Sequence, residues 1–238
     1  MSRRAVILAG GRGTRLRPYT VVLPKPLMPI GEYPILEVIV RQLAAQGFER
    51  VTMAVNHQAN LIKAFFGDGR QWGLSIDYSV EPRALSTIAP LSLIEDLPET
   101  FLLLNGDILT DLRFDRLLDW HASSGAVFTI AAARRTHTID YGVLDTDGAQ
   151  SLVGFREKPS AEYRVSMGVY GVTRSVLSLV PPGAAYGFDN LMADLLTGGA
   201  QVKVFPYDGY WADIGRPDDY AQAIDDFDRL RATLLPDA

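Results

Sequence analysis

The chain has 238 residues, of which 47% are hydrophobic and 21% charged, a balance that is ordinary for a soluble globular protein. Its formal net charge of −5 argues against a general nucleic-acid binder, because such proteins present a basic surface. The chain has no cysteine, which excludes disulfides and thiolate metal sites. Its apolar runs are far shorter than the roughly 18 residues that a membrane span needs, so no membrane contact is expected.

The N-terminal residues 1–4 lead directly into an apolar run, Ala5–Leu8, that is short enough to be one buried strand. Because this leaves no room for a signal peptide, we expect a cytoplasmic protein. Gly10, Gly11 and Gly13 follow the run at once. Glycines there let the backbone turn sharply and approach a ligand closely, and their N–H groups can point at phosphate oxygens.

Three cations, Arg15, Arg17 and Lys25, come after the glycines. A triphosphate would need them, so this stretch predicts an anion cradle; a plain strand-to-helix turn is the alternative. It is not a phosphate loop of the GxxxxGK[ST] type, because Gly13 is not followed by lysine. The dinucleotide fingerprint GxGxxG is excluded as well, because Leu16 would occupy the place of its third glycine.

Strands and helices alternate in the first half of the chain, which predicts a parallel sheet covered on both faces. The predicted strands after the first are Val51–Val55, Leu74–Val80 and Phe101–Leu104, and the predicted helices are Ile35–Leu43, Gln58–Phe66 and Leu91–Leu97.

The second half is richer in strands, and a turn at Asp147-Gly148 predicts a hairpin. We expect strands at Ala126–Ala133, Tyr141–Leu144, Ser151–Glu157, Val165–Thr173 and Val202–Phe205, a short extended piece at Tyr210–Ile214, and helices at Leu112–Ser123, Phe188–Thr197 and Pro217–Leu234.

Two aspartates stand out as candidate metal ligands. Asp107 follows Gly106 at the end of an apolar strand, where ligands of open α/β sheets bind. Asp213 lies in an aromatic and apolar setting, where an unpaired charge would be costly. Mg²⁺ is usually held by one or two carboxylates together with substrate phosphates. For Asp107 the alternative is an ordinary turn residue.

Glu157-Lys158-Pro159 ends another apolar stretch, and in isolation it is also consistent with a solvated ion pair before a turn. His57, His121 and His137 are scattered without ligand spacing, so surface or packing roles are expected for them.

The string from Gly10 to Pro29 resembles the signature of the sugar-1-phosphate nucleotidylyltransferases, GGxGTRLxPxTxxxPKPLxPxxxxP, at almost every position. The resemblance implies an α/β, Rossmann-like three-layer fold with a mixed, mostly parallel central sheet. It implies one domain over residues 1–238, with a nucleotide-binding half of about 1–111 and a β-rich sugar-phosphate half of about 112–238. Members of this family commonly form homodimers, so the resemblance implies a homodimer.

The resemblance also implies a site. Arg15 and Lys25 would hold the triphosphate, Lys158 the sugar phosphate, and Asp107 and Asp213 a Mg²⁺ ion. The nucleotide contacts implied are Leu8, Ala9, Gly10, Gly11, Gly13, Thr14, Arg15, Glu81, Ser86, Thr87 and Asn105. The substrate contacts implied are Gly106, Tyr141, Gly142, Glu157, Lys158, Ser166, Gly168 and Asp189, with Glu157 accepting hydrogen bonds from sugar hydroxyls; Asp189 is equally suited to cap the helix after it.

The reaction implied is attack of a sugar 1-phosphate oxygen on the α-phosphorus of a nucleoside triphosphate, with release of pyrophosphate. The attacking phosphate is already ionised near neutral pH, so no general base is required. Positioning and charge stabilisation carry such transfers. We therefore expect five side chains to converge in one crevice: Arg15, Lys25, Lys158, Asp107 and Asp213.

Two departures bear on specificity. The family's L-G-T-A-G segment reads Leu85–Ala89 here, with serine and isoleucine adding bulk beside the nucleotide. Glu81, just upstream, can accept the N1–H and N2–H₂ donors of guanine, which favours GTP. Ser166 replaces an asparagine that commonly contacts the sugar, so a mannose-, heptose- or cyclitol-like acceptor is expected.

Other readings stay open. One is a glucose-1-phosphate adenylyl-, uridylyl- or thymidylyltransferase. Another is a non-catalytic regulatory homologue that binds a sugar nucleotide, against which the intact Arg15, Lys25, Asp107, Lys158 and Asp213 argue. A third is a cytidylyl- or molybdopterin-type transferase with the same fold, which the E-K-P and W-x-D-x-G strings disfavour.

Overall fold

The computed structural model describes residues 3–11, 13–56 and 58–235. Its main sheet has seven strands in the order β12-β8-β11-β6-β1-β4-β5. The central strands β6, β1, β4 and β5 are parallel, and β12 is parallel to β8, whereas β11 is antiparallel to both its neighbours. The bounds are β1 Arg3–Leu8, β4 Phe48–Val55, β5 Ser75–Val80, β6 Thr100–Asn105, β8 Phe128–Thr138, β11 Ser160–Thr173 and β12 Val202–Tyr207.

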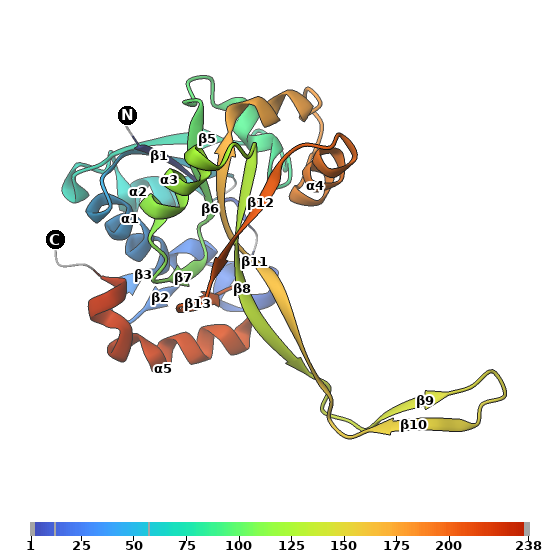
Figure 1. Cartoon of the computed structure of the whole chain (residues 1–238). Coiled ribbons are helices and arrows are strands. Elements are labelled where there is room, and N and C mark those ends of the chain that lie inside the picture. The colour runs from blue at the N-terminus through green and yellow to red at the C-terminus, as the bar shows by residue number, and fades with distance from the viewer. Residues whose placement is uncertain (1–2, 12, 57, 236–238) are drawn as a thin grey trace.

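Helices cover both faces of the sheet (Figure 1). The helices α1 Ile35–Ala45, α2 Ala59–Phe66 and α3 Phe114–Ser124 share one core cluster, and α4 Phe188–Thr197 belongs to the cluster on the opposite face. Strand β6 divides its side chains between the two: Leu102 and Leu104 pack on the first face, Phe101 and Leu103 on the second. The predicted Rossmann-like α/β fold with a mixed, mostly parallel sheet is confirmed.

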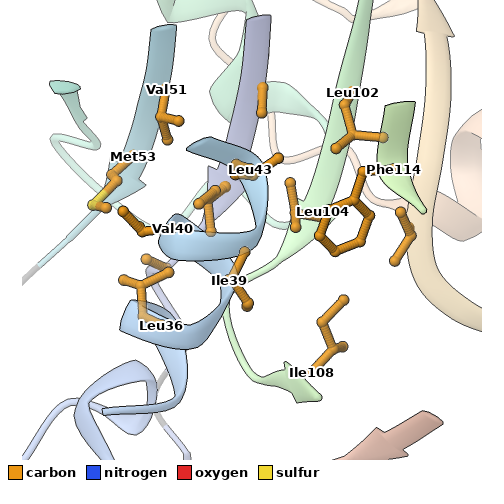
Figure 2. Packing of buried hydrophobic residues seen from close by; sticks show 14 of the residues in the cluster. Leu36, Ile39, Val40, Leu43, Val51, Met53, Leu102, Leu104, Ile108 and Phe114 are labelled. Carbon is orange, nitrogen blue, oxygen red and sulfur yellow. The ribbon is translucent and has the colours of Figure 1, made fainter. Parts of the chain in front are cut away.

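Helix α1 shows why this packing follows from the sequence. Its apolar residues Leu36, Ile39, Val40 and Leu43 recur at helical spacing, and all of them are at most 1% exposed. Figure 2 shows them facing the strand residues Val51, Met53, Leu102 and Leu104. Each such side chain contributes about 1.5–3 kcal/mol by leaving water. The helix ends before Gly47, which adopts the left-handed conformation that favours glycine.

Short elements fill the connections. Two small antiparallel pairs are β2 Pro29–Ile30 with β3 Tyr33–Pro34, and β7 Ile108–Thr110 with β13 Trp211–Asp213; the last helix, α5, spans Pro217–Leu234. The prediction of a helix over Leu91–Leu97 was wrong, because only a 3₁₀ turn at Ala89–Leu93 forms. Pro98 restricts the residue before it to extended backbone, which leaves too few residues for an α-helix.

Strands β8 and β11 are longer than predicted and leave the body together. Their pairing runs without a break from Ala133 opposite Val165 to Thr138 opposite Ser160. Beyond it lies the predicted hairpin, β9 Val143–Thr146 and β10 Leu152–Arg156. Figure 1 shows this hairpin far from the rest of the chain. We call residues 134–165 the arm; none of them is buried.

The remaining expectations concern membranes and histidines. None of the helices in the described ranges is both long and apolar enough to span a membrane. His121 is buried between the hydroxyls of Thr129 and Thr173, at 2.8 and 3.1 Å, and thus has a packing role. His137 is exposed on the arm, and His57 lies outside the described residues.

Candidate functional site

The glycine-rich loop leaves the carboxyl end of β1 and turns back towards the sheet. The side-chain amide of Asn56, just after β4, donates to the carbonyl of Gly10. Gly13 has a φ of 60°, and an added Cβ would lie 2.8 Å from the methyl group of Thr20, so only glycine fits there. The hydroxyl of Thr20 in turn donates to the carbonyl of Gly13 at 2.7 Å.

A cavity of about 380 Å³ opens beside this loop, outside the carboxyl ends of β1, β4 and β6. The predicted residues that line it are Leu8, Gly10, Gly11, Lys25, Glu81, Ser86, Thr87, Asn105 and Asp107. Four residues that were not predicted line it too: Pro26, Ala54, Asn56 and Ala84. The sequence signal for Asn56 is weak: it is a single polar residue that directly follows an apolar strand.

Lys25 is the centre of charge in this site. It is 6% exposed, its ammonium group contacts Asp107 Oδ2, and it lies 4.0 Å from Asp213 Oδ1. Burial lowers the pKa of Lys25 from 10.5 to about 8; nearby Arg15 lowers it further, while Asp213 opposes the shift. The ammonium group is thus held in place by carboxylates and is only partly compensated for its loss of water.

The two aspartates meet because β7 and β13 pair. Asp213 lies opposite Ile108, the residue after Asp107, and the N–H of Ile214 donates to the Asp107 carbonyl at 3.0 Å. A Cβ added at Gly215 would overlap the Lys25 ammonium and lie 2.9 Å from Asp213 Oδ1. The same point is 3.0 Å from a guanidinium nitrogen of Arg15, so three charged groups, those of Lys25, Asp213 and Arg15, surround it.

The backbone around Asp213 is held from two sides. Its N–H donates to Asp219 in the first turn of α5, at 3.2 Å. Asp219 also accepts from Arg135, whose guanidinium lies 4.9 Å from the centre of the Trp211 ring. The indole N–H of Trp211 donates to the carbonyl of Met167 at 2.9 Å. These contacts fix β13 against β11, and with it the position of the Asp213 carboxylate.

Asp107 and Asp213 fit a Mg²⁺ ion in the chemistry of their donors, since both offer carboxylate oxygens to one shared cation, the Lys25 ammonium. Within the described residues no group of three or more potential ligands is present. Two carboxylates with the remaining positions left to water and phosphate oxygens are what Mg²⁺ commonly uses.

The opposite end of the cavity is formed by Glu81 and the segment after it. Glu81 Oε2 accepts from the N–H of Leu85 at 3.1 Å, and its other oxygen, Oε1, lies beside Gly10. Burial raises the pKa of Glu81, although the Leu85 hydrogen bond opposes this. Ser86 has a φ of 71°, a conformation that favours glycine. The serine therefore holds a backbone conformation that glycine would adopt without strain.

A second cavity of about 230 Å³ continues from the first and shares Leu8, Thr87 and Asn105 with it. Its other lining residues are Ile88, Ser166, Gly168, Tyr170 and Phe188. The hydroxyl of Ser166 donates to the Tyr170 hydroxyl at 3.1 Å and accepts from the N–H of Gly168 at 3.3 Å. No charged side chain is among the described residues that line this second cavity.

Four predicted substrate contacts lie on the arm instead. Lys158 forms an ion pair with Asp140 at 2.7 Å, and its side chain is 57% exposed. Glu157 lies beside Gly142, and Tyr141 is 79% exposed. None of these residues lines either cavity. The expected convergence is thus met by Arg15, Lys25, Asp107 and Asp213, whereas Lys158 is carried away from them by the long ribbon of β8 and β11.

The remaining predicted residues surround the cavities without lining them. Gly106 donates its N–H to the Leu8 carbonyl at 3.0 Å, which closes the strand end next to Asp107. Ala9 continues β1 by donating to Ala54 at 2.8 Å, and Thr14 begins a 3₁₀ turn. Asp189 lies in the first turn of α4, where a negative charge is favourable, and the side chain that accepts from the N–H of the N-cap residue Gly187, at 2.9 Å, is that of Asn190.

Comparison with known proteins agrees with this geometry. Residues 4–229 match the family described as Nucleotidyl transferase. A UTP–glucose-1-phosphate uridylyltransferase from Synechocystis sp. is 33% identical over 93% of this chain and 62% of its own length. A mannose-1-phosphate guanylyltransferase from Mycobacterium tuberculosis is 32% identical over 94% of this chain and 64% of its own. The chain thus spans less than two thirds of these relatives.

The fold has solved counterparts. A crystal structure from Bacillus anthracis, described as that of a glucose-1-phosphate thymidylyltransferase in complex with sucrose, has a TM-score of 0.75 at 21% identity, with 94% of each chain covered. At that identity the likeness concerns the fold.

Proposed function

We infer, from the premise that this chain belongs to the nucleotidyl transferase family, that it joins a nucleoside triphosphate to a sugar 1-phosphate and releases pyrophosphate. The observation that carries the inference is the buried Lys25 between Asp107 and Asp213, beside a glycine-rich loop and at the mouth of a cavity. A buried cation next to a cradle of backbone N–H groups suits a polyphosphate.

Arg15 and Lys25 hold the triphosphate in this proposal, with the backbone of Gly10, Gly11 and Gly13 around it. Asp107 and Asp213 hold a Mg²⁺ ion, which supplies positive charge that offsets the charge on the phosphates. The acceptor phosphate is itself the nucleophile, so the protein contributes position and charge and needs no general base.

The acceptor belongs in the second cavity, next to Asn105, Ser166 and Gly168. Two polyanions must be brought together, so a cation is needed on the acceptor side as well. Lys158 is that cation in our proposal, with Glu157, Tyr141 and Gly142 beside it on the sugar ring.

GTP is the nucleotide that we propose. Glu81 lies at the far end of the main cavity and presents carboxylate oxygens, which pair with the adjacent N1–H and N2–H₂ donors of guanine and with nothing equivalent on adenine. The acceptor that we propose is a mannose-, heptose- or cyclitol-like 1-phosphate, because Ser166 is shorter than asparagine and is already engaged with Tyr170. Both substrates are phosphorylated metabolites, so we place the reaction in the cytoplasm.

Pyrophosphate release, measured with Mg²⁺ across a grid of nucleoside triphosphates and sugar 1-phosphates, tests these assignments. We expect release only with a triphosphate and a sugar phosphate together, and most of it with GTP. Preference for ATP, UTP or dTTP would contradict the role of Glu81 and leave the reaction class standing. Binding of a sugar nucleotide without release in any pair would instead favour the regulatory homologue.

A further inference from the structure

We propose that two copies of this chain exchange their arms, so that Lys158 and Glu157 of each copy complete the acceptor side of the other copy's site. The proposal rests on the proposed function, which assigns Lys158 to the acceptor phosphate. The observation behind it is an uneven distribution of positive charge between the second cavity and the arm. The second cavity has no cation among its described lining residues, whereas the arm presents Lys158 to solvent.

The arm of the same chain does not fill this gap. From Ser160 to Ser166 it is a strand paired residue by residue with Thr138 to Ala132. At about 3.3 Å per residue, these six steps place Ser160 roughly 20 Å from Ser166 at the cavity wall, with Lys158 farther out. Lys158 could return to its own cavity only if this ladder were broken.

The base of the arm is also fixed. Between Ser166 and Tyr170 the pairing register shifts, and Gly168 adopts a φ of 73° there. Met167 at this bulge is 1% exposed, and its carbonyl accepts the indole N–H of Trp211. The strand therefore leaves the body in a direction set by buried contacts, which disfavours closure of the arm onto its own chain.

A second copy fits the arm in shape and in chemistry. Strand β11 pairs with β6 only from Val169 onward, and β12 pairs with β8 only as far as Ala133. Among the described residues, both outer edges of the arm's ribbon thus lack a neighbouring strand, and such open edges readily pair with another chain. An isolated two-stranded hairpin is moreover marginally stable in water.

Several large apolar side chains on the arm are exposed to solvent. Six large ones, each at least 56% exposed, are Tyr141, Leu144, Leu152, Val153, Phe155 and Tyr163. Exposed apolar groups in such a concentration mark a contact surface. The occupant that also supplies the missing cation is an identical chain, because its arm carries both the apolar residues and Lys158.

The geometry of a two-fold dimer supports the exchange. A two-fold axis makes residue i of one copy meet residue j of the other, and the reverse. If the axis crosses the two arms near Glu162, midway along the strand, the partner subunit's Lys158 comes to Ser166 of this chain. The same two-fold contact then places one Lys158 beside the second cavity of each copy.

A heterodimer of two inactive variants tests this arrangement. Lys25→Ala and Lys158→Ala chains, co-expressed with different tags and purified through both, form a dimer in which one site has both lysines. We expect about half of the wild-type rate of pyrophosphate release, since one of two equivalent sites is intact. The Lys25→Ala with Asp107→Asn heterodimer is the control, because both defects lie in the body and no site is restored.

The outcomes are distinct. No heterodimer after two-tag purification, or a heterodimer as inactive as each parent, overturns the exchange even if the wild type is active. If the wild type releases no pyrophosphate with any pair, the proposed function fails, and a second readout decides the exchange. Since the chain has no cysteine, Lys158→Cys with Ser166→Cys can be joined by a short bismaleimide. A covalent dimer supports exchange; a cross-linked monomer overturns it.

Discussion

Lys25 shows how much chemistry one buried residue can concentrate. Its ammonium group touches one carboxylate and lies within 4.0 Å of a second, and an arginine is close by. Burial without full compensation is the reason its pKa falls to about 8. A lysine held in this way is already in position for a phosphate, because binding requires little further ordering of its side chain.

We expect Lys25→Ala to lower kcat for pyrophosphate release by about 10²- to 10³-fold, because one preorganised cation at the reacting phosphates is lost. Steady-state kinetics with saturating substrates will measure this, and far-UV circular dichroism will show that the fold is retained. Lys63→Ala is the matched control, since Lys63 lies on α2 with its ammonium over the Tyr78 ring and away from the cavity; its rate should stay within about twofold.

The raised pKa of Glu81 leads to a prediction about how the KM for GTP depends on pH. The carboxylate must be ionised to accept from guanine, and burial raises its pKa above the usual 4.5. As the pH falls from neutral towards this raised pKa, Glu81 becomes protonated, so the KM for GTP should rise earlier than an ordinary glutamate would allow. Initial rates at fixed acceptor and varied GTP, between pH 7 and pH 5, measure the effect.

Glu81→Gln is the control for that pH profile. It keeps the size of the side chain but has no proton to gain, so its KM for GTP should be raised by about 10-fold or more at pH 7, through loss of a charged acceptor, and should stay flat at lower pH. Equal pH dependence in both proteins would refute the contact between Glu81 and the base.

The residues of the glycine-rich loop could be predicted from the sequence because their spacing is dense and specific. Asp107 and Asp213 could be named, but their meeting depends on the pairing of β7 with β13 across more than a hundred residues of chain, which no local pattern encodes. Asn56 was missed because a single polar residue after a strand is a weak signal, although it lines the cavity.

At the scale of elements, strand β11 consists of two parts with different surroundings. Its second half lies in the sheet, between β6 and β8, and its first half belongs to the exposed arm. The bulge at Gly168 separates the two halves. A Cβ at this glycine would lie 2.5 Å from the side-chain nitrogen of Asn105, in a conformation that already disfavours any other residue.

We therefore expect Gly168→Ala to destabilise the protein by roughly 1–3 kcal/mol, from backbone strain and displacement of Asn105. Urea unfolding followed by fluorescence measures the change. Gly148→Ala, at the tip of the hairpin, is its counterpart: an added methyl group there meets nothing within 4 Å, and the change should stay within about 0.5 kcal/mol. Similar stabilities for the two variants would contradict the role given to the bulge.

The extension of β8 and β11 into the arm was not predictable from periodicity. Residues 134–138 and 160–164 are almost entirely polar, and a ribbon with both faces in water shows no alternation of apolar and polar residues. Buried elements such as α1 and β6 were predicted well for the opposite reason, since their apolar spacing records which face is covered. The hairpin beyond the ribbon was predicted from the turn signal at Asp147-Gly148.

At the scale of the whole molecule, the two cavities are built by different parts of the chain. The main cavity is lined entirely by residues before position 134, whereas the second cavity takes Ser166, Gly168, Tyr170 and Phe188 from beyond the arm. Because the arm contributes no buried side chain, the body should fold without most of it.

We therefore expect that a variant with residues 140–158 replaced by Asn-Gly, a two-residue hairpin turn, still unfolds cooperatively. Its affinity for the nucleotide should change by no more than about twofold, since distant sites are nearly independent. Pyrophosphate release should fall by at least about 100-fold, because the acceptor phosphate loses its positioning group. Isothermal titration with the triphosphate and the coupled assay give the two numbers. Loss of nucleotide binding would show that the halves are not separable.

The arm's freedom from the core has an evolutionary consequence. A substitution in a packed strand is constrained by the neighbours that it must fit, whereas an exposed position of the arm such as Tyr141 meets fewer such constraints within its own chain. If the arm contacts the acceptor as proposed, the preference for the acceptor can thus change by substitutions on the arm without disturbing the packing around the glycine-rich loop.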